Sequence, residues 1–386
     1  MKILFFIFAR TDARGGHYHS LNHISQKLGE KYRVQIVTIG YGNAKVLEEN
    51  PYYDTHIPFN GLNVVDLFFR SKQIIKEFQP DVIHFFDIRS FNILRLFLNS
   101  RKRKLILQIC GGPNRPKVPF ARDIILLSKE NYDYYSKLKK LADSNISLIP
   151  NRVSQLYQNL FQPIKKIPDT FNFVRICRIG SAYQKSIVDS INLVELLIDK
   201  GYKFVNLYIV GFIEDNEIYQ QITERIRYSQ NIHIVTDENI TKEASCILYL
   251  ADAVIATGRG FMEGASLGKP LLTFNIEDDL PLLVDENNFS EAFYANFSPR
   301  VKVNQYNRED NIYKIEKLIA EKSYYQQQAE FAKKMFLDYF DVNQILPQYT
   351  KVYQKATHGA NKIFKDFIWI LRTYIRVWLD SKKNVK

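Results

Sequence analysis

DAVIATGRGFMEGASLGKP, the stretch Asp252–Pro270, predicts a strand, a glycine-containing turn and a short helix in immediate succession. The apolar run stops before Gly258 and Gly260, which let the backbone turn tightly and approach a ligand closely. The N-terminus of the helix offers unpaired N–H groups and the positive end of the helix dipole to a phosphate. Glu263, one turn inside this helix, can accept hydrogen bonds from two ribose hydroxyls. The stretch therefore favours a nucleotide site over a plain turn with a solvated glutamate.

Short apolar runs of this kind recur along the chain and alternate with stretches of helical period. Such alternation is typical of a mostly parallel sheet built from βαβ units. In the second half of the chain the predicted strands are Phe173–Cys177, Val205–Val210, Ile232–Val235, Ala253–Ala256, Leu271–Phe274 and Ala292–Tyr294. In the first half they are Ile3–Ala9, Arg33–Ile39, Asp81–Phe86, Lys104–Ile109, Ile124–Leu127 and Ser147–Ile149. The predicted helices of the first half are His17–Leu28, Val65–Phe78 and Glu130–Ala142.

The two patterns are separated by QPIKKIPD, which begins at Gln162 and carries two prolines and two lysines without apolar period. This composition is typical of an interdomain linker. We therefore predict an α/β protein with two Rossmann-like domains facing across a cleft. The expected boundaries are 1–162 for the first domain, 163–170 for the linker, 171–345 for the second domain and 346–386 for a helical C-terminal extension.

Length and composition agree with two globular domains. The chain has 386 residues, of which 46% are hydrophobic and 24% charged, which is typical of globular proteins. A chain of this length rarely folds around a single hydrophobic core. The three cysteines lie far apart without metal-ligand spacing, which favours a reducing cytoplasm over a disulfide scaffold. The apolar start lacks a signal-peptide cleavage site, and no apolar run of about 18 residues predicts a membrane span. The net charge of +12 attracts an anionic partner. The cations do not lie on a recognisable nucleic-acid-binding motif, so we do not expect this partner to be a nucleic acid.

Two cations follow the first predicted strand of the second domain. Arg178 lies just beyond the strand end, and Lys185 starts the next helical stretch. A planar guanidinium and a point-like ammonium at this edge can together neutralise a diphosphate. Cations at helix starts are common, so surface cations are the alternative interpretation.

Together with EGASLGKP, which runs from Glu263 to Pro270, these two cations resemble the donor half of the GT-B glycosyltransferases. Within that group the chain is most similar to the large retaining family called glycosyl transferases group 1. Four further motifs agree with this resemblance: Gly15-Gly16, Pro80–His84, Ile149–Val153 and Tyr208–Gly211. The resemblance spans nearly the whole chain, although each motif is short.

The resemblance implies a role for each matching residue. The first domain would bind the acceptor and the second the nucleotide sugar. Arg178 and Lys185 would hold the donor diphosphate, and Glu263 the ribose. The implied donor-binding set is Gly15, Gly16, Arg178, Lys185, Gly258, Arg259, Gly260 and Glu263. Such enzymes need no metal and no cofactor, because cations and a helix dipole neutralise the leaving diphosphate.

The chain departs from the family pattern at three places. The family carries two glutamates with seven residues between them, but the position of the first is Ile255, inside a strand. The histidine that often follows the fourth strand is replaced by Cys110 or Gly111, and the usual Asn-Gly after Pro150 is Asn-Arg. Retention of configuration is implied by the family but is put in doubt by these changes.

An inverting course requires a general base on the first domain, and His17 and Asp87 are the candidates. His17, His19 and His23 also gather at the first predicted helix, where histidines four residues apart share a face. No cysteine or carboxylate partner lies near them in the sequence, so we expect acceptor or donor contact through His17 and no metal site.

The C-terminal segment Asn361–Lys382 predicts an amphipathic helix with an apolar face roughly 160° wide. This face comprises Ile363, Phe364, Phe367, Ile368, Leu371, Tyr374, Ile375, Trp378 and Leu379. The cations Lys362, Lys365, Arg372 and Arg376 lie on the other side, and Arg95 and Arg101–Lys104 add a basic cluster on the first domain. Two interpretations are open: the apolar face packs back onto the first domain, or it binds an anionic membrane surface. The flanking cations favour the membrane.

We therefore expect a glycosyltransferase that moves a sugar from a UDP- or GDP-sugar to a glycan or lipid-linked acceptor in cell-surface polysaccharide biosynthesis. Its expected place is the cytoplasm, at the inner face of the cell membrane, and the abundance of Lys, Ile, Asn, Phe and Tyr hints at an AT-rich bacterial genome. Two alternatives remain: a non-catalytic GT-B scaffold subunit, and a GT-B fold nucleotide-sugar epimerase or phosphorylase.

Overall fold

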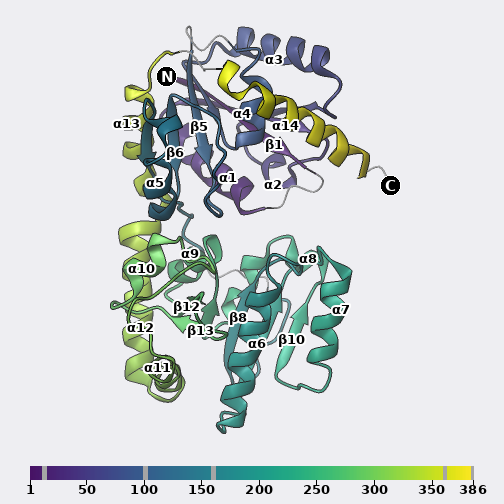
Figure 1. Ribbon diagram of the computed structural model, residues 1–386. Coiled ribbons are helices and arrows are strands. Elements are labelled where there is room, and N and C mark those ends of the chain that lie inside the picture. The colour runs from purple at the N-terminus through teal and green to yellow at the C-terminus, as the bar shows by residue number, and fades with distance from the viewer. Residues whose placement is uncertain (11–14, 99–102, 158–161, 360–362, 384–386) are drawn as a thin grey trace. The chain divides into compact units, whose positions relative to one another are not determined.

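The computed structural model describes residues 1–10, 15–98, 103–157, 162–359 and 363–383 (Figure 1). The chain forms two compact units. Unit 1 comprises Met1–Asn151 and Val342–Lys386, and unit 2 comprises Arg152–Asp341. Each unit is built on one β-sheet with helices on both faces, which confirms the predicted α/β class with two Rossmann-like domains.

Unit 1 contains a seven-stranded sheet in the order β3-β2-β1-β4-β5-β6-β7, and all its strands are parallel. The strands are β1 (Lys2–Ala9), β2 (Arg33–Gly40), β3 (Tyr53–Pro58), β4 (Val82–Phe85), β5 (Lys104–Ile109), β6 (Asp123–Leu126) and β7 (Asn145–Leu148). Nearly every residue of β1, β4, β5 and β6 is buried. Burial on both faces explains why these strands are continuous apolar runs in the sequence.

Two groups of helices cover the faces of this sheet. One face packs on α1 (Gly16–Gly29), α2 (Lys45–Glu48) and α13 (Ile345–Lys355). The other packs on α3 (Val64–Phe78), α4 (Ile88–Leu94), α5 (Lys129–Tyr135) and α14 (Ile363–Lys383). The helix α13 brings the hydroxyl of Tyr353 to 3.0 Å from Nδ1 of His84, and complete burial lowers the pKa of this histidine to about 3. His84 is therefore a neutral core residue.

Unit 2 contains a six-stranded sheet in the order β10-β9-β8-β11-β12-β13. The strands are β8 (Phe171–Ile176), β9 (Val205–Val210), β10 (Ile232–Val235), β11 (Ala253–Ile255), β12 (Leu271–Phe274) and β13 (Pro281–Leu283); only β13 runs antiparallel to its neighbour. One face packs on α6 (Gln184–Asp199), α7 (Asn216–Arg225) and α11 (Arg308–Ala320). The other packs on a 3-10 helix (Ala244–Leu250), α9 (Arg259–Ser266), α10 (Phe289–Tyr294) and α12 (Lys322–Met335). The short helix α8 (Glu238–Thr241) precedes the 3-10 helix.

Eleven of the twelve predicted strands are present, and the twelfth is wrong. Residues 292–294 form the end of helix α10, because a three-residue apolar run does not distinguish a strand from one helical face. The predicted helix Glu130–Ala142 is interrupted: α5 ends at Tyr135, Leu138 is extended, and Lys139–Leu141 form a 3-10 turn. The strand β3 and the helix α4 were not predicted because they are short and partly polar, and β13 was not predicted because it has only three residues.

The units divide at other residues than the expected boundaries. The chain passes to unit 2 after Asn151, and it returns to unit 1 at Val342. Val153 forms a parallel bridge with Asp341, so both crossing points lie side by side. The predicted linker is tied to unit 2, where the Ile164 N–H donates to the Tyr249 hydroxyl over 2.9 Å and Lys166 pairs with Asp252.

The last helix, α14, packs onto unit 1 through a face that is largely polar. Its buried residues are Asp366, Ile370, Thr373, Val377 and Ser381. Oδ2 of Asp366 lies 3.0 Å from Nη1 of Arg95, and both side chains are almost completely buried. The same oxygen accepts the Phe120 N–H over 2.9 Å, and Lys140 pairs with Oδ1. A buried ion pair, rather than the apolar face, therefore anchors the helix. Lys362 and residues 101–102, named among the expected cations, lie outside the described residues.

We predict that Asp366→Asn lowers the free energy of unfolding by about 3–5 kcal/mol, because it leaves the Arg95 charge buried without its counterion. Urea unfolding followed by tryptophan fluorescence measures this, since the two tryptophans, Trp369 and Trp378, both lie in α14. The matched control is Asp380→Asn. Asp380 pairs with Arg89 at 3.3 Å but is partly exposed, so a loss of only about 0–1 kcal/mol is expected. Equal, small losses in both variants would contradict the anchoring role of Asp366.

Candidate functional site

The predicted donor-binding residues of the second unit follow the carboxyl ends of neighbouring strands. Arg178 follows β8 and Gly258 follows β11, and these two parallel strands pair directly. Lys185 lies in the first turn of α6, the helix after β8. Since parallel strands end at the same edge of a sheet, the structure brings these residues to one edge of the unit 2 sheet.

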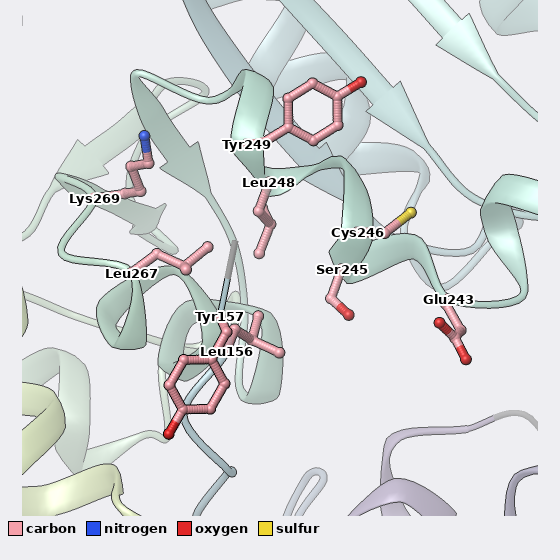
Figure 2. Close-up of a pocket in the computed structure, with 9 residues that line it drawn as sticks. All are labelled: Leu156, Tyr157, Glu243, Ser245, Cys246, Leu248, Tyr249, Leu267 and Lys269. Carbon is pink, nitrogen blue, oxygen red and sulfur yellow. The ribbon is translucent and has the colours of Figure 1, made fainter. Parts of the chain in front are cut away.

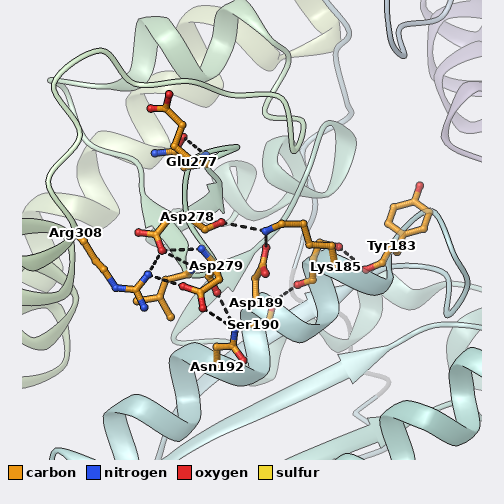
Figure 3. Close-up of polar contacts among 12 residues, drawn as sticks. Tyr183, Lys185, Asp189, Ser190, Asn192, Glu277, Asp278, Asp279 and Arg308 are labelled. Atoms are coloured by element: carbon orange, nitrogen blue, oxygen red, sulfur yellow. Dashed lines mark hydrogen bonds and ion pairs between the residues drawn. The ribbon is translucent and has the colours of Figure 1, made fainter.

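Lys185 lies between a carboxylate and a backbone carbonyl group at this edge (Figure 3). Its Nζ donates to Oδ2 of Asp189 over 2.7 Å and to the carbonyl oxygen of Asp278 over 3.0 Å. Burial raises the pKa of Asp189, while the ammonium of Lys185 acts in the opposite direction. The lysine side chain is 63% exposed whereas that of Asp189 is 4% exposed. The ammonium is therefore held in place and still accessible to a ligand.

Arg178 is held in a similar way. Its guanidinium forms an ion pair with Glu214, which follows β9, and lies 5.2 Å from the ring centroid of Tyr183. Both side chains of the ion pair are partly exposed. The pair links the loops after β8 and β9. Gly211, the first residue after β9, lies so close to Cys177 that an added Cβ would stand 1.7 Å from the Cys177 carbonyl oxygen.

The turn before α9 has the predicted form. Gly258 has a φ of +50°, which an L side chain rarely adopts, and it directly precedes the first helical residue, Arg259. Glu263 is buried, and its Oε1 accepts hydrogen bonds from Arg259 Nε at 2.7 Å and Nη2 at 2.6 Å. The glutamate is thus not the solvated residue of the alternative interpretation. Arg259, in the turn before Glu263, neutralises its carboxylate. An added Cβ at Gly260 would have ordinary contact with Ala256 at 3.5 Å.

An acidic loop after β12 was not predicted as part of this edge. Asp278 is buried, accepts the N–H groups of Asp279 and Leu280 at Oδ1, and also contacts Tyr306 and Arg308. The ion pair with Arg308 lowers the pKa of Asp279. The run EDDLP after a strand was a visible signal, and the spacing of Lys185 and Asp189 indicates a helical ion pair. The partner of Arg178, Glu214, had no such local signal.

In unit 1 the predicted residues follow β1 and β4. Gly15 precedes α1 as its N-cap, and space is open around Gly16, the first residue of the helix. The ring of His17 lies 4.0 Å from the ring of Tyr18. Asp87 caps α4: Oδ1 accepts the Ser90 N–H and Oδ2 accepts the Phe8 N–H, each over 2.7 Å. This capping role occupies both oxygens, and catalysis by His17 or Asp87 stays a prediction.

Two of the three departures from the family pattern, at Ile255 and at Cys110, place no ionised side chain there. Ile255 is the buried last residue of β11. Cys110 donates through Sγ to the Phe86 carbonyl oxygen over 3.1 Å, and burial raises the pKa of its thiol. The glycines that follow it, Gly111 and Gly112, have φ values of +73° and +89°. Among the described residues no group of three or more His, Cys, Asp or Glu side chains could hold a metal ion.

A pocket of about 220 Å³ lies elsewhere on unit 2 (Figure 2). It is lined by Leu156, Tyr157, Glu243, Ser245, Cys246, Leu248, Tyr249, Leu267 and Lys269. Lys269 lies two residues before β12, and the 3-10 helix that supplies Tyr249 ends shortly before β11. The pocket therefore lies at the amino ends of the strands and is distinct from the edge that carries Arg178 and Lys185.

Comparison with known proteins identifies the fold. No sequence-family model and no curated protein matches the chain. Solved structures do match. The glycosyltransferase of Rickettsia africae is 16% identical, with 93% of this chain and 99% of that chain covered and a TM-score of 0.65. HepE of Anabaena in complex with UDP-glucose is 14% identical, with 92% and 99% covered and a TM-score of 0.64. A putative UDP-N-acetylglucosamine 2-epimerase of Listeria monocytogenes is 14% identical, with 93% and 98% covered and a TM-score of 0.57. These likenesses show that the chain has the GT-B fold.

We predict that Gly211→Ala lowers the free energy of unfolding by about 3 kcal/mol, at the upper end for an overpacked site, because the new methyl group meets fixed backbone. Urea unfolding measures the change. Gly260→Ala is the matched control at the same edge of the sheet. Its methyl group finds ordinary contact and alanine favours the helix, so its stability should be unchanged or higher. Wild-type stability of Gly211→Ala would show that the loops after β8 and β9 are not packed as described.

Proposed function

We propose that the chain is a glycosyltransferase that takes a sugar from a nucleotide-sugar donor, a UDP- or GDP-sugar. The observation that carries the proposal is the convergence of Arg178, Lys185 and the N-terminus of α9 at one edge of a sheet, in a chain with the GT-B fold. Glu263, buried in the first turns of that helix, supplies a carboxylate beside them. The Anabaena neighbour was solved with UDP-glucose, which supports this class of donor.

The charges at this edge suit a nucleoside diphosphate. In transfer, the bond between the anomeric carbon and the donor phosphate oxygen breaks, and negative charge develops on the diphosphate. Arg178 and Lys185 stabilise that charge, as do the N–H groups at the N-terminus of α9. The acceptor hydroxyl forms the new bond to the anomeric carbon and gives up its proton. Charge neutralisation by side chains and backbone makes a metal unnecessary in this proposal.

The carboxylates Glu214 and Asp189 hold the two cations before the donor binds. Each cation is at least one third exposed, so a diphosphate reaches it without unfolding the site. The bound phosphates then pair with the two cations, either together with these carboxylates or in their place. The family resemblance also assigns Gly15 and Gly16, which belong to unit 1, to donor binding. In unit 2, Arg259 holds Glu263 for the ribose hydroxyls. The group 1 likeness supports retention, and with Ile255 in place of the first glutamate the sugar contact must come from other residues.

The proposed acceptor is a glycan or a lipid-linked glycan of cell-surface polysaccharide biosynthesis. The proposed place is the cytoplasm, with peripheral attachment to the inner face of the cell membrane. Within the described residues no helix is long and apolar enough to cross a membrane. The excess of cations, +12 overall, supports contact with an anionic surface.

A nucleotide-sugar epimerase is the second candidate. The Listeria neighbour, described as a putative UDP-N-acetylglucosamine 2-epimerase, covers 93% of the chain with a TM-score of 0.57 and favours this alternative. Product analysis with a nucleotide sugar separates the two candidates. A transferase releases the nucleoside diphosphate in an acceptor-dependent reaction, whereas an epimerase converts the sugar without any acceptor.

We predict that Arg178→Ala and Lys185→Ala each lower kcat/KM for transfer by about 10²–10³-fold, because each removes a cation from the developing diphosphate charge. The matched control is Arg227→Ala, which removes an exposed arginine that pairs with a neighbouring exposed glutamate, Glu224, and lies over the ring of Tyr228. Its activity should stay at the wild-type level. All three variants should keep the wild-type midpoint of thermal unfolding within a few degrees, since the changed side chains are exposed in part. Undiminished turnover of both site variants would refute the assignment.

A further inference from the structure

The helix α14 has most of its large apolar side chains on the outside. Six of its large apolar residues are 46–96% exposed: Phe364, Phe367, Ile368, Leu371, Ile375 and Leu379. A surface helix normally turns such residues toward the core and its polar residues toward water. Here the buried face contains Asp366, Thr373 and Ser381, whose partners belong to unit 1. The six exposed apolar side chains are therefore not used by the fold of unit 1, whereas Val377 and Tyr374 pack on its core.

The position of α14 is fixed by several polar contacts. The Arg95–Asp366 pair lies near its start, and at its end the Ser381 hydroxyl donates to the carbonyl oxygen of Asn60 over 3.2 Å. Gly61, with a φ of +94°, lies directly on the helix backbone: an added Cβ would stand 2.7 Å from the Trp378 nitrogen. The exposed apolar face is thus presented by a fixed helix rather than by a loose terminal segment.

The charges of α14 are distributed unevenly. Its only acidic residues are Asp366 and Asp380, and each pairs with a cation of unit 1. Its cations Lys365, Arg372, Arg376, Lys382 and Lys383 are all exposed. At 100° per residue the six apolar side chains span about 120°, and all these cations except Lys382 occupy an adjoining strip of about 40°. The outward surface of the helix is therefore apolar along one strip and cationic along the next.

The neighbouring segment extends this surface. Leu62, just before α3, and Val65 and Phe69, near its start, are 64–68% exposed. Helical spacing places Lys72 and Lys76 on the same face as Val65 and Phe69, and both lysines are exposed. Gly61 contacts α14, so the next residue, Leu62, lies beside that helix. Figure 1 shows α3 and α14 as neighbouring elements of unit 1.

We propose that α14 docks unit 1 on an anionic lipid surface. The six apolar side chains enter the boundary between headgroups and acyl chains, and Lys365, Arg372 and Arg376 contact lipid phosphates. Charge favours this occupant over a second copy of the chain, since antiparallel pairing of two α14 helices would bring the two cationic strips together. The proposal refines the membrane contact named above and does not depend on sugar transfer.

Flotation of the full chain with vesicles tests the proposal without donor or acceptor. Phosphatidylcholine vesicles containing phosphatidylglycerol should bind the wild type, and pure phosphatidylcholine vesicles should bind it at least about tenfold less. The triple variant Phe364→Ser/Ile368→Ser/Leu371→Ser should lower the partition coefficient at least about tenfold. Arg372→Gln/Arg376→Gln should lower binding to the anionic vesicles about tenfold or more and weaken its salt dependence.

Tyr228→Ser is the matched control, because Tyr228 is an equally exposed aromatic residue of unit 2 (86% exposed) and its loss should leave vesicle binding unchanged. Tryptophan fluorescence of the variants checks that α14 remains packed. The proposal is overturned if the wild type does not float with anionic vesicles, or if the triple variant floats as well as the wild type. It is also overturned if sedimentation velocity shows that the wild type is a dimer and the triple variant a monomer. That result would assign the apolar face to contact with a second copy of the chain. Loss of vesicle binding with intact transfer to a soluble acceptor would leave the proposed activity untouched.

Discussion

Parallel pairing of β8 with β9 and β11 is the constraint on which the candidate site depends. It places the ends of these strands together, so Arg178, Glu214 and Gly258 meet at one edge although they lie far apart in sequence. Gly211 is needed for the same reason, because its backbone lies against Cys177. The helix α9 then begins at this edge with its N–H groups directed outward, where an anion is stabilised.

The second feature of the site is that its cations are already paired. Lys185 with Asp189 and Arg178 with Glu214 form ion pairs whose cationic members remain partly exposed. Such pairs contribute little stability at a surface, so a diphosphate can compete for the cations at modest cost. The pairs also fix the side chains in advance, which lowers the entropy lost when the donor binds. The site is therefore organised without a ligand and neutral enough to avoid repulsion between its cations.

The sequence predicted most of the sheet, since buried parallel strands such as β5 and β9 are continuous apolar runs. It could not predict β13 or α10, because three apolar residues fit a strand and a helix equally well. At the site, Arg178, Lys185 and Glu263 were predicted from their places after strands and in the first turns of helices. Glu214 could not be predicted, because it reaches Arg178 only through the folded sheet. The terminal helix shows the same limit. Its apolar face was visible in the sequence, but its packing through the Arg95–Asp366 pair was not, since that contact joins residues 271 positions apart.

The central claim is that the edge of the unit 2 sheet binds a nucleoside diphosphate. Calorimetric titration of the full chain with UDP and with GDP tests it most directly, because binding is measured without knowledge of sugar or acceptor. The account predicts saturable binding of at least one of the two nucleotides at one site per chain, weakened about tenfold or more when Lys185 becomes alanine. Absence of measurable binding for both nucleotides would contradict it and would favour a non-catalytic GT-B scaffold.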